Sequence, residues 1–150
     1  MSYDNSYPIL SFVVPYYNEQ TIIRESMAEI IRQLKAQFDT CAYELILVND
    51  SSNDNSLDII KQFKNMPEVN FVNFSTGPSH RENLGVAMSQ AKGDIICYFD
   101  IDLSCDMASL KSLIDAVRRE GFDIAVGNRY DPLFTLKRNP GRKHISKIFN

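Results

Sequence analysis

Residues 95–104 read Ile-Ile-Cys-Tyr-Phe-Asp-Ile-Asp-Leu-Ser. The run is rich in apolar, β-branched and aromatic residues, which is typical of a buried parallel strand, and two carboxylates follow it, Asp100 and Asp102. Ligands of open α/β sheets gather at the carboxyl ends of strands. Mg²⁺ and Mn²⁺ favour oxygen ligands, commonly one or two carboxylates together with substrate phosphates. We therefore expect a metal-dependent site for a phosphorylated substrate where this strand ends.

Strand-like and helix-like segments alternate on both sides of this run. Apolar runs predict further strands at residues 9–14, 43–48, 69–74 and 122–126. Helical spacing and helix-end signals predict helices over residues 19–38, 54–65, 81–91 and 106–120. The alternation indicates an α/β domain, a Rossmann-like and mostly parallel sheet with helices on both faces. The pattern stops after Gly127, and we treat residues 1–150 as one domain.

Local signals also predict where some elements end and which helix faces are buried. Pro15 is expected to stop the first strand, and Gly93 is expected to be the C-cap glycine of the third helix. Apolar residues at helical spacing predict the inward faces of two helices, at positions 23, 27, 30, 31, 34 and 38 in one and 110, 113, 114 and 117 in the other.

Composition narrows the class of protein. The 150 residues are enough for one domain with a core, and no stretch is long and apolar enough to span a bilayer. No signal peptide opens the chain. The three cysteines, Cys41, Cys97 and Cys105, are odd in number and lack metal-type spacing, so we expect reduced thiols, mostly in the core. A cytoplasmic setting follows.

The charge is unevenly distributed along the chain. Residues 129–150 contain six lysines or arginines and one acid, which gives them a net charge of +5. Since the whole chain has a net charge of −3, residues 1–128 have a net charge of −8. A basic end on an acidic body suggests that the end meets phosphates or an anionic surface. The alternative is a solvated basic tail. No nucleic-acid partner is expected, and the oligomeric state stays open.

Polar residues follow three of the predicted strands. They are Asn18-Glu19, Asp50, and the Asp100/Asp102 pair. A single aspartate at a strand end is more often a helix cap or turn former than a ligand. Three such positions on one edge of a sheet favour a site.

Several short motifs resemble glycosyltransferase family 2, in order and spacing, over about residues 8–130. They are Pro15-Tyr16-Tyr17-Asn18-Glu19, Val48-Asn49-Asp50-Ser51-Ser52, Asn83-Leu84-Gly85 and Ala91-Lys92-Gly93-Asp94. Asp100-Ile101-Asp102 then falls where that family has its D-x-D metal motif. The resemblance implies the GT-A fold, a nucleotide-sugar donor, Mg²⁺ or Mn²⁺, and inversion at the sugar carbon.

Later motifs are similar to the polyprenyl- and dolichyl-phosphate hexosyltransferases within that family. They are Asp102-Leu103-Ser104, Gly127-Asn128-Arg129-Tyr130, and Arg142 with Ser146. The likeness implies a lipid-phosphate acceptor at a membrane surface, with the protein on the cytoplasmic face if helices follow the chain. The Asp-Leu-Ser form favours a UDP-sugar donor.

The same resemblance implies roles for individual residues. Asp100 would reach the ribose or a metal-bound water, Asp102 would bind the metal, and Arg129 and Arg142 would neutralise the leaving diphosphate or hold the acceptor phosphate. The residues implied to hold the nucleotide base are Pro15, Tyr17, Glu19 and Asp50.

Two other functions remain open at this point. A haloacid-dehalogenase-like phosphatase also has an apolar strand ending in Asp-x-Asp, although that motif normally starts the domain. The second alternative is a non-catalytic nucleotide-binding module. It is suggested because no helix or strand is predicted after residue 127 to complete the domain, so that its C-terminal part looks missing. We expect residues 129–150 to be mobile in the isolated chain and to order when a nucleoside diphosphate binds.

Overall fold

Four parallel strands form the centre of the computed structural model, which describes residues 9–39 and 41–127 apart from the side chain of His80. The strands lie in the order β3-β2-β1-β4, so the predicted α/β fold class is confirmed. The elements along the chain are β1 (Leu10–Tyr16), α1 (Ile23–Phe38), β2 (Tyr43–Asp50), α2 (Ser56–Ile60), the 3-10 turn η1 (Lys61–Phe63), β3 (Val69–Phe74), α3 (His80–Ser89), β4 (Ile95–Tyr98), the 3-10 turn η2 (Met107–Ser109) and α4 (Leu110–Glu120).

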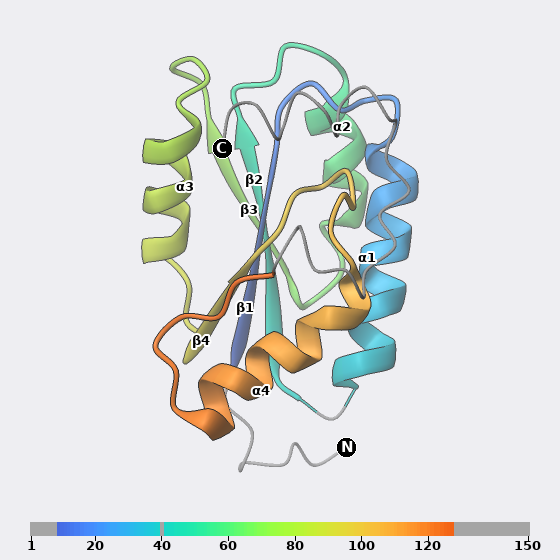
Figure 1. The fold of residues 1–150 in the computed structure, drawn as a ribbon. Coiled ribbons are helices and arrows are strands. Elements are labelled where there is room, and N and C mark those ends of the chain that lie inside the picture. The colour runs from blue at the N-terminus through green and yellow to red at the C-terminus, as the bar shows by residue number, and fades with distance from the viewer. Residues whose placement is uncertain (1–8, 40, 128–150) are drawn as a thin grey trace, which may run out of the picture.

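Helices cover both faces of the sheet, as Figure 1 shows with α3 on one side and α1 and α2 on the other. The larger apolar cluster joins alternate residues of β1 and β2 to α1 and α4. Five of the six predicted positions of α1 are buried in it, and Ile31 packs partly buried against it. A smaller cluster packs Val13, Ile46 and Val48 against Ala87 of α3. The predicted inward residues of α4 are only half confirmed, because Leu110 and Ile114 are buried whereas Leu113 and Val117 are partly exposed.

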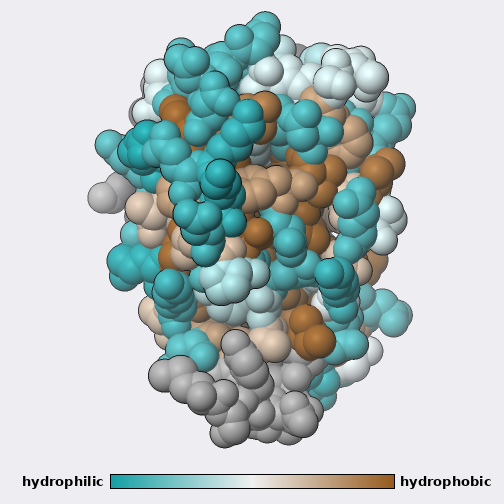
Figure 2. All heavy atoms as spheres, turned by 180° about the vertical axis from the view of Figure 1, so that it is seen from behind, coloured by the Kyte–Doolittle hydropathy of each residue, from teal (hydrophilic) through white to brown (hydrophobic). Residues whose placement is uncertain are grey.

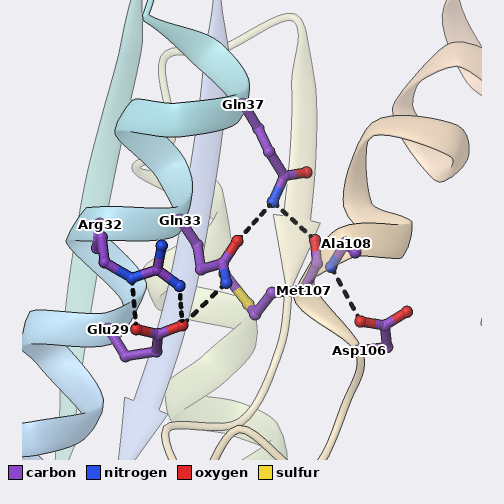
Figure 3. A network of polar contacts seen from close by, with 7 residues as sticks. All are labelled: Glu29, Arg32, Gln33, Gln37, Asp106, Met107 and Ala108. Atoms are coloured by element: carbon purple, nitrogen blue, oxygen red, sulfur yellow. Dashed lines mark hydrogen bonds and ion pairs between the residues drawn. The ribbon is translucent and has the colours of Figure 1, made fainter.

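A chain of polar side chains ties α1 to the segment that follows β4 (Figure 3). Arg32 and Gln33 both bond to the Glu29 carboxylate, and Gln37 donates to Gln33 Oε1 at 3.3 Å. The same Gln37 amide nitrogen donates to the Met107 carbonyl oxygen at 3.0 Å. The turn that carries Met107 is thereby fixed to α1, which limits the freedom of the loop between β4 and α4.

Two strand predictions are wrong in an informative way. β1 does not stop at Pro15 but continues to Tyr16. The Val13 carbonyl oxygen accepts a hydrogen bond from the Phe99 amide, on the side of β1 that faces β4. The backbone nitrogen of Pro15, two residues further along the strand, points to the same side. Pairing with β4 has ended by then, so the missing N–H of the proline costs no ladder bond. Residues 122–126, expected as a fifth strand, form no strand, and Phe122, Ile124 and Val126 are exposed, since no described neighbour pairs with them.

Helix ends also differ from the prediction. α1 begins at Ile23 rather than at Glu19, and the amides of Glu19 and Gln20 bond instead to the side chains of Ser56, at the start of α2, and Asp54, just before it. The predicted helix over 54–65 divides into α2 and the turn η1. α3 ends at Ser89 with Gln90 as its C-cap, so Gly93 is not a helix cap.

The surface seen from behind has hydrophobic groups across its middle, interrupted by hydrophilic side chains (Figure 2). The exposed large apolar residues include Phe71 on β3, Val86 on α3 and Ile96 on β4. Within the described part of the chain, none of the helices combines the length and the apolar character that crossing a bilayer requires.

Candidate active site

A cavity opens where β1 and β4 separate. β1 pairs with β2 as far as Tyr16, but its pairing with β4 ends at Val13 opposite Tyr98. Chain order also reverses here, since β1 leads to β2 on one side while β4 lies on the other. Crevices at such reversal points, outside the carboxyl ends of the strands, are where open α/β sheets bind ligands. The cavity measures about 280 Å³ and is lined by Pro15, Tyr16, Tyr17, Glu19, Asp100, Ile101 and Asp102.

Strained backbone marks the loops around this cavity. Three non-glycine residues in the described segments have positive φ: Asn18 at 54°, Ser51 at 65° and Leu103 at 53°. They lie in the loops that follow β1, β2 and β4. A left-handed backbone is costly for residues other than glycine and persists where the surroundings enforce it, often at ligand sites. All three residues with positive φ therefore lie beyond the carboxyl ends of strands, at the edge of the sheet where the cavity opens.

The loops after β1 and β2 are joined by five hydrogen bonds. Asn18 is at the centre, because its N–H donates to Ser52 Oγ at 3.1 Å and its Oδ1 accepts from the Asn53 amide at 2.8 Å. The remaining three bonds are Glu19 N to Ser56 Oγ, Gln20 N to Asp54 Oδ2, and Asn55 N to Gln20 Oε1. We call these contacts the loop clasp. It fixes the backbone of Asn18 between Tyr17 and Glu19, the two neighbours that line the cavity.

The opposite wall of the cavity carries the two aspartates. Asp100 Oδ1 accepts from the Tyr98 hydroxyl at 2.7 Å, and Asp102 Oδ1 accepts from the Ser104 amide at 2.9 Å. The second oxygen of each carboxylate takes no hydrogen bond from the described residues. Because Phe99 and Ile101 point into the core, the alternation along this segment turns the acids outward. Within residues 9–39 and 41–127, each carboxylate is thus held by a hydrogen bond to one of its two oxygens.

Negative charge gathers in the cavity and suits a cation. Burial, followed by repulsion from Asp102 and Asp54, raises the pKa of Glu19 above its ordinary value. Carboxylate oxygens are hard ligands of the kind that Mg²⁺ and Mn²⁺ prefer. Among residues 9–39 and 41–127, no three His, Cys, Asp or Glu side chains are placed to hold a metal alone. A cation bound by Asp100 or Asp102 would need further oxygens from water and from a phosphorylated ligand.

Two tyrosines by the cavity keep their phenolic protons. Burial raises the pKa of Tyr16 well above its ordinary value, with a smaller contribution from Asp54. The pKa of Tyr98 is raised by burial and then by its bond to Asp100. Both hydroxyl groups are therefore hydrogen-bond donors across the neutral pH range.

Asp50 has a structural role, which is the more common one for a single aspartate at a strand end. It is 3% exposed at the end of β2, and its Oδ1 accepts from the Ser79 amide at 3.1 Å and from Asn83 Nδ2 at 2.5 Å. These bonds fix the start of α3 to the sheet. Asp50 is not among the residues that line the cavity, and its Oδ2 takes no bond from the described residues.

The structure brings five of the sequence-predicted site residues into one cavity: Pro15, Tyr17, Glu19, Asp100 and Asp102. Asp50 lies on the same sheet edge, one strand away. Arg129 and Arg142 lie outside the described residues, as does the expectation that residues 129–150 are mobile. The bond from Tyr98 to Asp100 was missed, although the alternation of residues 98 and 100 along a strand could have indicated it.

The thiols are not part of the cavity wall. Cys41 is buried, and burial raises the pKa of the half-buried Cys97 to about 11, so both are unreactive core groups. Cys105 is exposed, in contrast to the core position expected for most of the cysteines.

The parallel sheet, the crevice at the chain reversal and the two aspartates on its wall agree with the GT-A fold. The sequence profile of glycosyl transferase family 2 matches residues 11–150, and the chain belongs to that family. The match leaves the phosphatase alternative without support.

Curated relatives resemble most or all of the chain. It is 32% identical over 158 residues to an undecaprenyl-phosphate 4-deoxy-4-formamido-L-arabinose transferase of Yersinia pestis, covering 100% of this chain and 44% of the relative. It is 31% identical over 123 residues to the uncharacterized glycosyltransferase YkcC of Bacillus subtilis, covering 79% of this chain and 36% of that protein. The chain thus spans less than half the length of these relatives.

Solved structures share the fold. The mannosyltransferase PcManGT of Pyrobaculum calidifontis, solved with GDP-Man and Mn²⁺, superimposes with a TM-score of 0.61 at 22% identity, over 77% of this chain and 34% of the other. S. aureus TarS 1-349 gives a TM-score of 0.59 at 23% identity, over 75% of this chain and 33% of the other. The likeness to these two structures confirms the GT-A fold class.

Proposed function

We propose that the whole protein is an inverting glycosyltransferase that moves a hexose from a nucleotide-sugar, with a UDP-sugar favoured, to a polyprenyl phosphate. The observation that carries the proposal is the cavity between β1 and β4, which unites Pro15, Tyr17 and Glu19 with Asp100 and Asp102. Family membership and the polyprenyl-phosphate transferase among the relatives support it.

The nucleoside half of the donor binds on the β1 and β2 side in this proposal. Pro15 and Tyr17 offer apolar and aromatic surface to the base, and Glu19 offers a carboxylate. Asp50 Oδ2 is the acceptor proposed for the base or ribose, while Oδ1 keeps its bonds to α3. The loop clasp holds this half rigid before the donor arrives, which lowers the entropy cost of binding.

The diphosphate half binds at Asp100 and Asp102. A Mg²⁺ or Mn²⁺ ion held there would supply positive charge to the departing nucleoside diphosphate, whose negative charge grows as the glycosidic bond breaks. Asp100 orients the ribose or a metal-bound water through its open oxygen, and Asp102 binds the ion. Arg129 and Arg142 are proposed to neutralise the leaving diphosphate or to hold the acceptor phosphate, because the planar guanidinium matches phosphate oxygens.

A phosphate acceptor explains why the cavity needs no strong general base. A polyprenyl phosphate is already anionic, so its oxygen attacks the sugar carbon without losing a proton in the transition state. Attack opposite to the leaving diphosphate inverts the configuration at that carbon. Because a lipid acceptor lies in a membrane, we also propose that the protein acts at the cytoplasmic face of a membrane.

Calorimetry with UDP tests the donor site directly. We expect UDP to bind in Mn²⁺ or Mg²⁺ and the affinity to fall at least tenfold in excess chelator. Asp102→Ala should remove most of this metal dependence while the far-ultraviolet circular dichroism stays unchanged. Equal UDP affinity with metal and with chelator would refute the proposal.

A transfer assay separates an enzyme from a non-catalytic nucleotide-binding module. UDP-glucose and a short polyprenyl phosphate are the substrates, and the full-length protein is the enzyme. Glycosylated lipid is the expected product, and binding of UDP without any transfer would favour the binding module.

A further inference from the structure

The side chain of Asp100 is held by the last residue of β4, two positions before it in the chain. Tyr98 ends β4, and its hydroxyl donates to Asp100 Oδ1 at 2.7 Å. Residues two apart on an extended chain face the same side, and the buried Phe99 between them points into the core. The contact therefore follows from the strand geometry and does not depend on a distant loop.

A restrained carboxylate has fewer orientations to lose when a ligand binds. Oδ1 is engaged with the phenol, and Oδ2 takes no bond from the described residues although Asp100 lines the cavity. We propose that Tyr98 is a positioning residue of the donor site, holding Asp100 so that Oδ2 meets the ribose or the metal-bound water of the nucleotide. This inference rests on the proposed function, because it assigns a positioning partner to Asp100, one of the residues of the proposed donor site.

A purely structural role for Tyr98 fits the packing less well. Its side chain is 41% exposed, and it belongs to neither of the two apolar clusters. It also lines a second hollow of about 360 Å³ beside α4. Removing the hydroxyl should therefore leave folding stability almost unchanged while it frees the Asp100 side chain.

The test is Tyr98→Phe, with Tyr43→Phe as the matched control. Tyr43 lies at the start of β2, at the other end of the sheet, and its ring packs against Phe12. We expect Tyr98→Phe to weaken UDP binding in Mn²⁺ roughly tenfold, the scale of a bond to a charged group. The melting temperature should not change. Tyr43→Phe should keep the wild-type affinity for UDP.

A double-mutant cycle shows whether Tyr98 acts through Asp100. In an Asp100→Ala background, Tyr98→Phe should have no further effect on UDP affinity, because the group it positions is gone. The same tenfold loss in that background would overturn the inference, as would unchanged UDP affinity in the single variant. A wild-type chain that binds no UDP in Mn²⁺ would instead refute the donor site itself, so the two failures are distinguishable.

Discussion

Gly93→Ala should be among the most destabilising single-methyl additions in this chain. A Cβ built on Gly93 would lie 2.6 Å from the Ser11 amide nitrogen, 2.7 Å from Ser11 Oγ and 2.8 Å from the Ile9 carbonyl oxygen. Ordinary contacts of a Cβ are 3.4–4 Å, so either the turn or β1 must move. Two of the three neighbours are backbone atoms, which a rotamer change cannot relieve.

The hydrogen bonds at this turn would be lost with the movement. Gly93 N donates to Ser11 Oγ at 2.8 Å, and Asp94 N donates to the Ile9 carbonyl at 2.8 Å. Ser11 is fully buried and itself donates to Glu44 Oε1 at 2.6 Å. Overpacking costs about 1–3 kcal/mol and an unsatisfied buried group about 1–3 kcal/mol more, so we expect a loss of roughly 3–5 kcal/mol.

Urea unfolding followed by circular dichroism measures this loss, with two other glycines as controls. Gly85 lies inside α3 with open space at its Cβ position, so Gly85→Ala should stabilise by about 0.5–1 kcal/mol. Gly121 is the left-handed C-cap of α4, so Gly121→Ala should cost about 1–2 kcal/mol. A Gly93→Ala protein as stable as Gly121→Ala would refute the close-approach argument.

Three further predictions concern the site. Asn18→Ala should cost about 1–2 kcal/mol and weaken UDP binding, whereas Asn18→Gly, which accepts the positive φ, should recover most of the stability in urea unfolding. Glu19→Gln should raise the melting temperature at pH 7. Because the pKa of Glu19 is raised in the folded state, the ionised carboxylate destabilises the fold, and this cost grows as the pH rises from the ordinary pKa through the raised one. The gain in melting temperature from Glu19→Gln should therefore vanish below about pH 4, where the carboxyl group is protonated in both states. Asp50→Ala should weaken uridine and UDP alike by about tenfold and also cost about 1–3 kcal/mol, since Asn83 loses its acceptor; unchanged uridine affinity would leave Asp50 with a structural role only.

Local pattern was enough to predict most elements and one wall of the site. The helical spacing in α1 reflects burial, which that segment needs whatever its partners are, whereas β4 is less buried than its apolar run predicted, since Ile96 and Tyr98 are exposed. The acids at the strand ends were likewise visible, and the family motifs around them led to the correct family. Residues 122–126 show the limit of such reasoning, because an apolar run needs a hydrogen-bonded neighbour to become a strand.

The sequence by itself determined most of the alternation of strands and helices, the buried face of α1 and the residue types available at the sheet edge, because all of these follow from periodicity over short stretches of chain. Tertiary structure alone decided that β1 runs through Pro15 and parts from β4, which opens the cavity. It also decided that Asn18 is held by a loop about 35 residues away and that Gly93 is needed for close approach to β1. These features depend on groups far apart in the sequence meeting at hydrogen-bond or contact distance, and no local pattern encodes such a meeting.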